Sequence, residues 1–311
     1  MLANYNAGPE LRHALESIAG EMSGQPWEAY VIDNASVDGS GAIVHEFAPQ
    51  AHLVSNQENV GFARAVNQGL RLASAPLVLI MNPDCRLVAG AIDAMVAELA
   101  AYPECALVGP KILNPDGSLQ GSARGDPDML TGLFGRTMLL RRLLPELPVS
   151  KRNVVPVEHG PDGAASIVAD WVSGACMLAR GSALQEVGGF DERYFLYWED
   201  ADLCRRLRHG GYHVRYVFGA TAVHRVAHSS RRAQAAAIRA FHESAYLYYA
   251  THVAPGGSHR QFGRRLRRRV KRIIARGILA ARCYMHLRST SSTGESRRSD
   301  GRHVRRPPGT P

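Results

Sequence analysis

The sequence lacks the features that mark a membrane-spanning or secreted protein. No stretch of about 18 apolar residues occurs along the chain, so we expect no membrane-spanning helix. The chain does not start with a basic segment followed by an apolar run, so we expect no secretory signal peptide. Its 5 cysteines are an odd number without C-x-x-C spacing, which disfavours a disulfide framework and favours a reducing cytoplasm.

Acidic residues are scarce in the C-terminal part of the chain. Residues 257–311 hold 16 Lys and Arg against 2 Asp and Glu, a surplus of +14, whereas the whole chain carries +9. Residues 1–256 therefore carry 9 − 14 = −5. Basic segments bind polyanions, either nucleic acid or anionic lipid. Aromatic residues are only 7% of the chain, but 45% of it is hydrophobic, enough for one large globular domain with an appendage.

Strand and helix signals alternate through the first third of the chain. Short apolar runs predict buried strands, and apolar residues at helical spacing predict the helices between them. The expected strands are residues 29–32, 52–55, 77–81 and 106–108, and the expected helices are residues 9–19, 41–47, 61–73 and 91–101. This alternation predicts an α/β fold with a mostly parallel central sheet covered on both faces. Ligands of such sheets bind at the carboxyl ends of strands, where Asp33 and Asp84 fall.

The remainder of the chain is less regular. Residues 114–166, rich in Gly, Pro and Arg, are expected to form a long insertion of the mobile-loop kind, with a helix at 130–144. Beyond it we expect order to return at 167–178, with strands at 213–217 and 222–224 and helices at 182–187, 200–209, 231–251 and 262–286. Residues 289–311 are expected to be disordered. Only three residues precede Asn4, so the first strand is either short or begins upstream of Met1.

Two acids at strand ends are candidates for nucleotide binding. Asp84 follows the apolar run LVLIM in a turn, where a carboxylate can hold Mg²⁺ or Mn²⁺ against a diphosphate. Asp33, in VIDNASVDGS, can accept a hydrogen bond from a nucleobase imide. Both are also explained as turn or helix-capping residues. The same holds for the polar residues that follow Asp33, which are Asn34, Ser36, Asp38 and Ser40.

Residues 195–207, FLYWEDADLCRRL, place three acids after an aromatic cluster. The acids are Glu199, Asp200 and Asp202, and the aromatic residues are Phe195, Tyr197 and Trp198. Acids at a helix N-terminus are favoured by the helix dipole. Aromatic rings beside acids also suit a site that stacks a sugar while a general base deprotonates its hydroxyl. His224, with His228 four residues on, is either a structural histidine or a metal ligand.

The basic segment at residues 260–272 holds 8 Lys and Arg in 13 residues and continues into an apolar stretch. An amphipathic helix here would place Ile273, Ile274, Ile278 and Leu279 on lipid while the arginines meet anionic headgroups. The alternative is a solvated, partly disordered tail. Nucleic acid is not expected as a partner, because the chain has neither a reader helix nor an aromatic-basic module.

Six segments, in order, resemble glycosyltransferase family 2 in its rhamnosyltransferase-like branch, over residues 1–250. They are NYN at 4–6, VIDNASVDGS at 31–40, NVGFARAVNQG at 59–69, MNPD at 81–84, residues 170–212 with the triplet WED, and AVHRVAHSS at 222–230. The resemblance implies a nucleotide-diphospho-sugar transferase sandwich of the GT-A type. The catalytic domain would be 1–256, with a nucleotide-sugar half at 1–110 and an acceptor half at 167–230, followed by a basic amphipathic helix at 257–288.

The resemblance also implies roles for residues of the nucleotide-sugar half. Tyr5 and Asp33 would contact the nucleobase, and Asn59, Gly61 and Phe62 would lie near the nucleotide-sugar.

The metal and acceptor sites follow from the same resemblance. Asp84 matches the last Asp of the family's D-x-D motif, but Asn82 stands at its first position, which leaves one carboxylate fewer and puts more weight on His224, a matching metal ligand. Asp200 matches the catalytic base. The acceptor-binding residues would be Trp171, Trp198 and Glu199.

The implied activity is an inverting transfer of a sugar, L-rhamnose from dTDP-rhamnose in the nearest subgroup, with a UDP-sugar as the other donor considered. The acceptor would be a hydroxyl of a lipid-linked or polysaccharide glycan of the cell envelope. Mg²⁺ or Mn²⁺ would assist, and the protein would be cytoplasmic, peripheral to the inner face of the bacterial cell membrane. Two alternatives stay open: transfer of galactofuranose, N-acetylglucosamine or mannose, and a non-catalytic polyanion-binding protein. A nucleotidyltransferase is disfavoured, because no Gly-rich loop with Arg or Lys occurs early in the chain.

Overall fold

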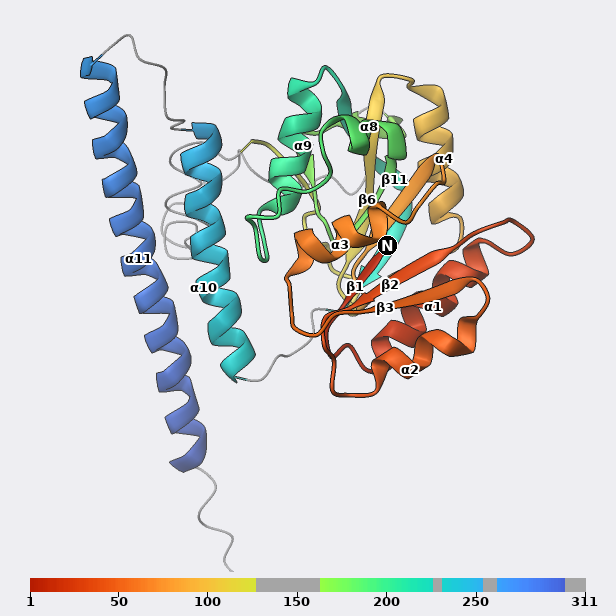
Figure 1. The fold of residues 1–311 in the computed structure, drawn as a ribbon, viewed down its shortest axis with the longest axis horizontal. Helices are drawn as coiled ribbons and strands as arrows, with labels where there is room; N and C mark the ends of the chain where they lie inside the picture. The colour runs from red at the N-terminus through yellow and green to blue at the C-terminus, as the bar shows by residue number, and fades with distance from the viewer. Residues whose placement is uncertain (127–162, 226–230, 254–261, 300–311) are drawn as a thin grey trace, which may run out of the picture. The chain divides into compact units, whose positions relative to one another are not determined.

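The computed structural model describes residues 1–126, 163–225, 231–253 and 262–299 (Figure 1). The chain divides into two compact units, Met1–His228 and Ser229–Pro311. The division therefore falls before residue 231, whereas the sequence placed it after residue 256. The helix expected at 130–144, inside the insertion, lies outside the described residues.

A three-stranded parallel sheet opens the first unit, in the order β1-β2-β3. Its strands are β1 (Leu2–Asn4), β2 (Ala29–Asp33) and β3 (Ala51–Ser55). The connecting helices are α1 (Pro9–Glu21), α2 (Ser40–Val44) with a 3₁₀ turn η1 (His45–Phe47), and α3 (Phe62–Leu70). The expected strands and helices are confirmed here, although α3 ends before residue 73. β1 has only three residues, yet all of them pair with β2.

A second, six-stranded sheet has the order β4-β10-β6-β11-β5, with β8 also paired to β11. Its strands are β4 (Leu77–Met81), β5 (Cys85–Leu87), β6 (Cys105–Leu113), β8 (Ser166–Val168), β10 (Cys176–Arg180) and β11 (His213–His224). Among these pairs only β6 and β11 run parallel. The expectation of a mostly parallel sheet therefore holds for the first sheet and is wrong for the second. β10 and β5 enter antiparallel, which needs no crossover helix.

In the described part of this unit, three further helices and a small ribbon pack with the sheets. The helices are α4 (Ala91–Ala101), α8 (Gly181–Glu186) and α9 (Glu199–His209), and the ribbon is β7 (Ala123–Arg124) paired with β9 (Trp171–Val172). α4 packs on β11 and β6, and α9 packs on β9 and β11. The two strands expected at 213–217 and 222–224 are instead one strand, because β11 absorbs an irregularity in register between Val217 and Thr221 and continues.

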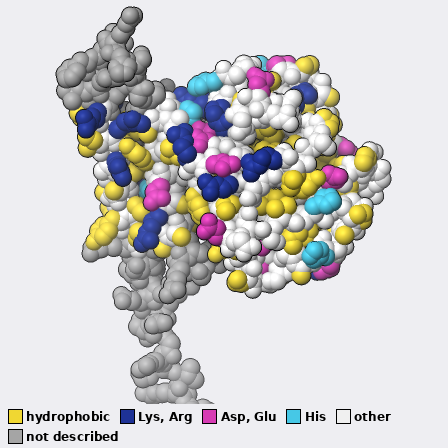
Figure 2. All heavy atoms as spheres, in the orientation of Figure 1, with side chains coloured by type: hydrophobic (Ala, Val, Ile, Leu, Met, Phe, Trp, Pro, Cys, Tyr) yellow, Lys and Arg dark blue, Asp and Glu magenta, His cyan; other side chains and the backbone are white. Residues whose placement is uncertain are grey.

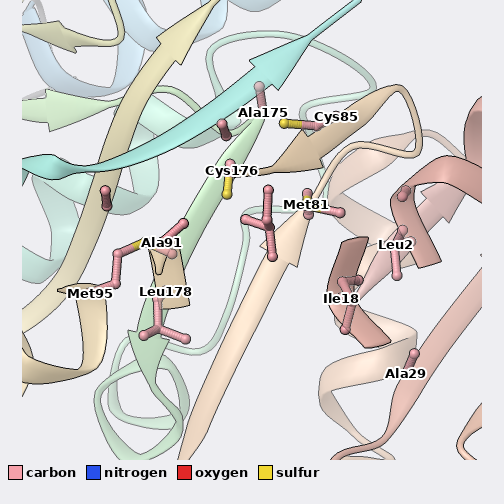
Figure 3. Close-up of a cluster of buried hydrophobic side chains, with 14 of the residues drawn as sticks. Leu2, Ile18, Ala29, Met81, Cys85, Ala91, Met95, Ala175, Cys176 and Leu178 are labelled. Atoms are coloured by element: carbon pink, nitrogen blue, oxygen red, sulfur yellow. The ribbon is translucent and has the colours of Figure 1, made fainter. Parts of the chain in front are cut away.

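Buried apolar side chains from both sheets form the core of the first unit. In one cluster Leu2, Met81 and Cys176 are at most 1% exposed, and Figure 3 shows Leu2 beside Ile18 and Met81 beside Cys176. A hydrogen bond from the Met81 amide to the carbonyl of Met1 joins the two sheets at this point (3.0 Å). The core therefore holds the ends of β1 and β4 in register, and these ends carry the candidate residues. All five cysteines are free thiols.

The second unit consists of α10 (Arg231–Tyr248), a π-helical turn η3 (Tyr249–Val253) and α11 (Phe262–Ser299). α10 and α11 pack against each other, and Ala245, Tyr248, Ala275 and Leu279 are buried. α11 extends through residues 289–299, so the expectation of disorder is wrong for them, and residues 300–311 lie outside the described part. No helix within the described ranges is both long and apolar enough to cross a bilayer.

Candidate functional site

Asp33 and Tyr5 lie at the carboxyl ends of neighbouring strands. Asp33 is the last residue of β2, and its parallel pairing with β1 puts it beside Asn4. The Asn4 amide donates to Asp33 Oδ1 at 2.6 Å and to Ser40 Oγ at 2.8 Å. Asp33 is 7% exposed, whereas Tyr5 is 51% exposed. A fixed, buried carboxylate next to an open aromatic ring suits the edge and the face of a planar base.

The loop after β2 is held by its own polar residues. Asp38 accepts hydrogen bonds from the Gly8 amide (2.7 Å) and from both the amide and hydroxyl of Ser40 (3.0 and 2.6 Å). Burial by itself would raise the pKa of Asp38, but these hydrogen bonds lower it overall. Asp38 and Ser40 are thus turn-forming residues that hold the strand end.

Gly61 brings the predicted nucleotide-sugar loop against the aromatic segment of residues 195–198. Its amide donates to Asn59 Oδ1 (3.0 Å), and the next amide, of Phe62, donates to the carbonyl of Phe195 (2.8 Å). Gly61 has φ 87° and ψ 172°, and a Cβ there would lie 2.5 Å from the Phe195 carbonyl oxygen. Only glycine fits this position without strain.

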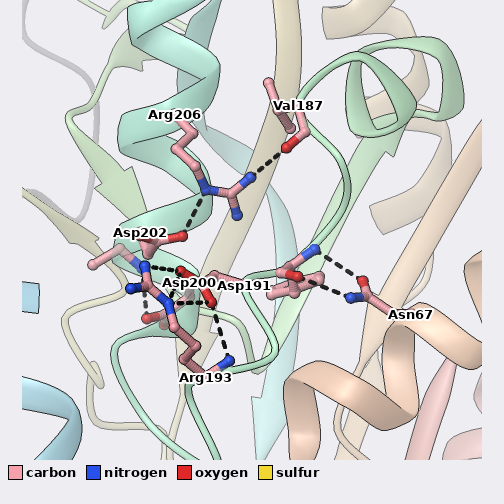
Figure 4. A network of polar contacts seen from close by, with 9 residues as sticks. Asn67, Val187, Asp191, Arg193, Asp200, Asp202 and Arg206 are labelled. Carbon is pink, nitrogen blue, oxygen red and sulfur yellow. Dashed lines mark hydrogen bonds and ion pairs between the residues drawn. The ribbon is translucent and has the colours of Figure 1, made fainter. Parts of the chain in front are cut away.

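Asn67 fastens the same helix to the segment that leads to the acids. Its side chain exchanges two hydrogen bonds with the backbone of Phe190, of 2.8 and 2.9 Å, and Figure 4 shows this pairing beside Asp191. Asn67 is 7% exposed. This role was not predicted from the sequence, although a polar side chain on the buried face of an apolar helix is a usable signal for such a contact.

Asp84 and His224 meet, although 140 positions separate them in the chain. Asp84 Oδ1 lies 3.2 Å from His224 Nε2, and the Asn82 amide nitrogen lies 3.3 Å from the same ring atom. The pairing of β11 with β5 brings them together, since His224 stands opposite Cys85. Their side chains are 18% and 13% exposed. His228, the other histidine considered, lies outside the described residues.

Asp200 and Glu199 begin α9, and their environments differ. Asp200 accepts hydrogen bonds from the amides of Gly174 (2.9 Å) and Ala201 (2.8 Å). Burial raises the pKa of Asp200, and these bonds oppose the rise, as does the charge of Arg124. Burial raises the pKa of Glu199 well above its usual range, and the charge of Asp200 adds to it. Glu199 Oε2 is buried without a hydrogen-bond partner among the described residues.

Two backbone contacts place these acids at the same edge as Asp84. The backbone N–H of Gly174 donates to Asp200. The carbonyl of the next residue, Ala175, accepts from the backbone N–H of Asn82 at 2.9 Å. Burial raises the pKa of Tyr197. The charges of Glu199 and Asp84 raise that pKa further, because a negative charge nearby disfavours the phenolate. These contacts connect Asp200 to the end of β4 that precedes Asp84, and Asp84 in turn meets His224.

The predicted acceptor-binding tryptophans lie near α9, since Trp198 directly precedes it and Trp171 belongs to β9, on which α9 packs. The Arg124 guanidinium carbon lies over the Trp171 ring, 4.8 Å from the ring centroid. Trp171 Nε1 donates to the Gly125 carbonyl (3.0 Å). Trp198 precedes α9 with φ 70°, and Tyr197 has φ 68°. Non-glycine residues rarely adopt such angles, which cost on the order of 1–3 kcal/mol each and gather at functional sites. Arg124 is a further residue that sequence reasoning missed, because the surrounding segment has no periodic pattern.

The chemistry of Asp84 and His224 fits a divalent cation. A carboxylate oxygen and an imidazole nitrogen face one another, and both atoms bind divalent metals in proteins. The described ranges hold no group of three or more His, Cys, Asp or Glu side chains placed for a metal. The other ligands would then be phosphate oxygens and water, as is usual for a cation bound with a nucleotide.

The chain matches known families and known proteins along most of its length. Residues 1–146 match the model of Glycosyl transferase family 2, and residues 158–289 match Glycosyl transferase family group 2. The N-acetylglucosaminyl-diphospho-decaprenol L-rhamnosyltransferase of Mycobacterium tuberculosis is 32% identical over 96% of each chain. A rhamnosyltransferase of Escherichia coli K12 is 41% identical over 83 residues, 27% of this chain and 31% of that one.

Among solved structures, a mannosyltransferase of Pyrobaculum calidifontis in complex with GDP-Man and Mn²⁺ has a similar fold. Its TM-score is 0.54 at 19% identity, over 95% of this chain and 78% of that one. The likeness supports the fold that the sequence predicted, a nucleotide-sugar transferase sandwich.

Proposed function

Since the chain belongs to glycosyl transferase family 2, we propose that it transfers L-rhamnose from dTDP-rhamnose to a hydroxyl of a lipid-linked saccharide, with inversion at the anomeric carbon. The donor and acceptor follow the relative from Mycobacterium tuberculosis, which is named for L-rhamnose and for N-acetylglucosaminyl-diphospho-decaprenol. That relative is matched along almost the whole chain, which includes the acceptor half.

One observation carries the proposal. Asp84 and His224 are 3.2 Å apart, and the Gly174–Ala175 backbone ties Asp200 to the same strand ends. A diphosphate site and a base at one edge are what a sugar transfer needs, because the leaving group and the attacking hydroxyl must both reach the anomeric carbon.

Asp200 is the base in this proposal. Its two backbone hydrogen bonds fix the carboxylate, so that one lone pair can take the proton of the acceptor hydroxyl. The acceptor oxygen bonds to the anomeric carbon from the face opposite the nucleoside diphosphate, whose bond to that carbon breaks. This single displacement inverts the anomeric configuration.

Other residues bind and orient the substrates. Asp33 and Tyr5 would hold the base, Asn59 and Gly61 the nucleotide-sugar, and Trp171 the acceptor sugar. Asp84 and His224 would hold Mg²⁺ or Mn²⁺, whose charge stabilises the diphosphate as it leaves.

We also propose that α11 binds the inner face of the bacterial cell membrane, where a polyprenyl acceptor would be found. The large apolar residues on one side of α11 are exposed, namely Val270, Ile273, Ile274, Tyr284 and Met285. Lys271 and Arg276 lie on either side of this apolar face at helical spacing, while Ala275 and Leu279 on the opposite side are buried. No acid occurs between Glu243 and Glu295. Cations beside an apolar face suit anionic headgroups above acyl chains.

Basic and apolar side chains are interspersed on the visible face of this unit (Figure 2). The unit thus offers both contributions to membrane binding, apolar burial and electrostatic attraction.

The test of the transferase is the Asp200→Asn variant. We expect transfer from dTDP-rhamnose to fall by a factor of about 10³ or more, since general-base catalysis supplies about 10²–10⁴-fold and the amide also lacks the negative charge. Binding of dTDP with Mn²⁺, measured as a thermal shift, should stay close to wild type, with UDP and GDP as comparison nucleotides.

Asp93→Asn is the matched control, because Asp93 is an exposed acid in the first turn of α4. It should leave both readouts unchanged. Retained turnover in Asp200→Asn would remove Asp200 as the base.

A further inference from the structure

Gln120 follows a tight reversal at the end of β6, in a segment that the sequence analysis left without a role. The backbone N–H of Asn114 donates to the Ser118 carbonyl (2.7 Å), and the backbone N–H of Gln120 donates to the Ile112 carbonyl (2.9 Å). This reversal carries Gln120 alongside β6, whose neighbour in the sheet is β11 with His224 at its end.

The hydrogen bonds of Gln120 fix which end of its amide faces which group. Its Nε2 donates to the carbonyl oxygen of His224 and to Asn114 Oδ1, both at 2.7 Å. A backbone carbonyl only accepts, so the nitrogen must face it. The amide oxygen Oε1 is therefore directed at the His224 ring, 2.9 Å from Nδ1.

This contact decides the tautomer of His224. An amide oxygen has no hydrogen to donate, so Nδ1 must carry one. In the neutral ring Nε2 then carries a lone pair, with the Asn82 side-chain nitrogen at 3.3 Å and Asp84 Oδ1 at 3.2 Å. Two electron-rich atoms facing each other suit a shared cation. Metal-binding histidines are commonly held in this way, through the ring nitrogen that does not bind the metal.

We propose that Gln120 is a positioning residue that holds His224 in the Nδ1–H form and presents Nε2, together with Asp84, to the divalent cation. It contacts His224 at two points: the bond to the backbone carbonyl holds the Gln120 amide in place, and the bond to Nδ1 would break if the imidazole turned. This inference rests on the proposed function, because it assumes that a cation binds there.

The test compares Mn²⁺ affinity of the full chain with dTDP present, by the electron paramagnetic resonance signal of unbound Mn²⁺. Gln120→Leu should weaken Mn²⁺ binding by about 10–100-fold, the usual range for losing such a partner. Gln120→Glu should weaken it less, because a carboxylate still accepts from Nδ1–H. The control is Gln185→Leu, the same change at an exposed position on α8, which should match wild type.

A second readout separates positioning from general damage to the fold. The nitrogen chemical shifts of the His224 ring, assigned by comparison with His224→Ala, should show the Nδ1–H form in wild type and in Gln120→Glu. Gln120→Leu should show a smaller share of the Nδ1–H form, because Nδ1–H has then lost its acceptor.

The outcomes distinguish this inference from the proposed function. If wild type binds Mn²⁺ no better than His224→Ala, the cation site fails and the inference fails with it. If His224→Ala loses Mn²⁺ while Gln120→Leu keeps both the wild-type affinity and the Nδ1–H form, Gln120 is not a positioning residue, and the transferase proposal stands.

Discussion

Adjacent acids in one turn of helix can have opposite protonation, and hydrogen bonds decide which. Asp200 accepts two backbone N–H bonds, whereas Glu199 Oε2 has no partner among the described residues. Burial raises the pKa of both. Because donors stabilise the charged form, we expect Asp200 to lose its proton first while Glu199 keeps its own. The neutral Glu199 then adds no negative charge beside the base.

This order predicts the pH dependence of transfer. Only ionised Asp200 can take a proton, and its pKa is raised, so kcat/KM should rise with pH through an acid limb above the usual Asp range near 4. The charged groups that act on the pair are Asp202, which raises the pKa of Glu199, and Arg124, which lowers that of Asp200. A pH profile of kcat/KM in wild type measures the limb.

Glu199→Gln serves as the control for this profile. Since Glu199 is already neutral when Asp200 titrates, the position of the limb should not move, whatever happens to the rate. A limb that shifts markedly in this variant would mean that the two acids titrate in the opposite order.

At the scale of elements, glycine geometry decides how closely two loops approach. Gly61 begins α3 at a φ of 87°, with no room for a Cβ beside Phe195. Gly211, after α9, has a φ of 89° and nothing within 4 Å of a Cβ. At both positions the φ would strain any side chain, but only Gly61 has the close contact.

Gly61→Ala should therefore do more than destabilise. Strain at either glycine costs on the order of 1–3 kcal/mol, so both alanine variants should lower the free energy of unfolding measured in urea. Only Gly61→Ala must push the Phe195 segment away, and we expect it alone to weaken dTDP-rhamnose binding, measured by calorimetry. Equal binding in both variants would show that the contact between Gly61 and Phe195 does not shape the donor site.

At the scale of the whole molecule, charge is divided unequally: residues 1–256 carry −5 and residues 257–311 carry +14. Such an acidic body does not compete for anionic surfaces, so the attraction is confined to the basic end. Apolar burial would add to it through the exposed face of α11.

Membrane binding should depend on both contributions. The double variant Ile273→Ser, Ile274→Ser should reduce co-sedimentation of the full chain with vesicles that contain anionic lipid by about tenfold or more, because burying one Ile is worth about 1.5–3 kcal/mol. Raising the salt concentration should reduce it as well. Leu72→Ser, at a 50% exposed position in the first unit, is the control.

Two results would overturn the membrane proposal. Wild type that does not sediment with anionic vesicles has no such surface. If the double variant instead changes the oligomeric state and keeps wild-type sedimentation, the apolar face pairs with a second copy of the chain.

The sequence alone determined the elements whose local pattern is strong. The run LVLIM forms β4 with the predicted ends, and residues 91–101 form α4. Both were predictable because an apolar run and a helical period are patterns of neighbouring residues. The family was determined in the same way, since its motifs are short runs such as VIDNASVDGS and WED. The candidate acids could be named because they fall at strand ends or in those motifs.

Only the tertiary structure decided what depends on pairing between distant segments. The antiparallel entry of β10 and the single long β11 have no local signal, because a strand's partner is set by the rest of the sheet. The 3.2 Å approach of Asp84 to His224, and the grip of Gln120 on that ring, come from this pairing. Local motifs in the sequence show which functional groups the chain has. Hydrogen bonding between distant strands determines which of those groups lie close enough to act together.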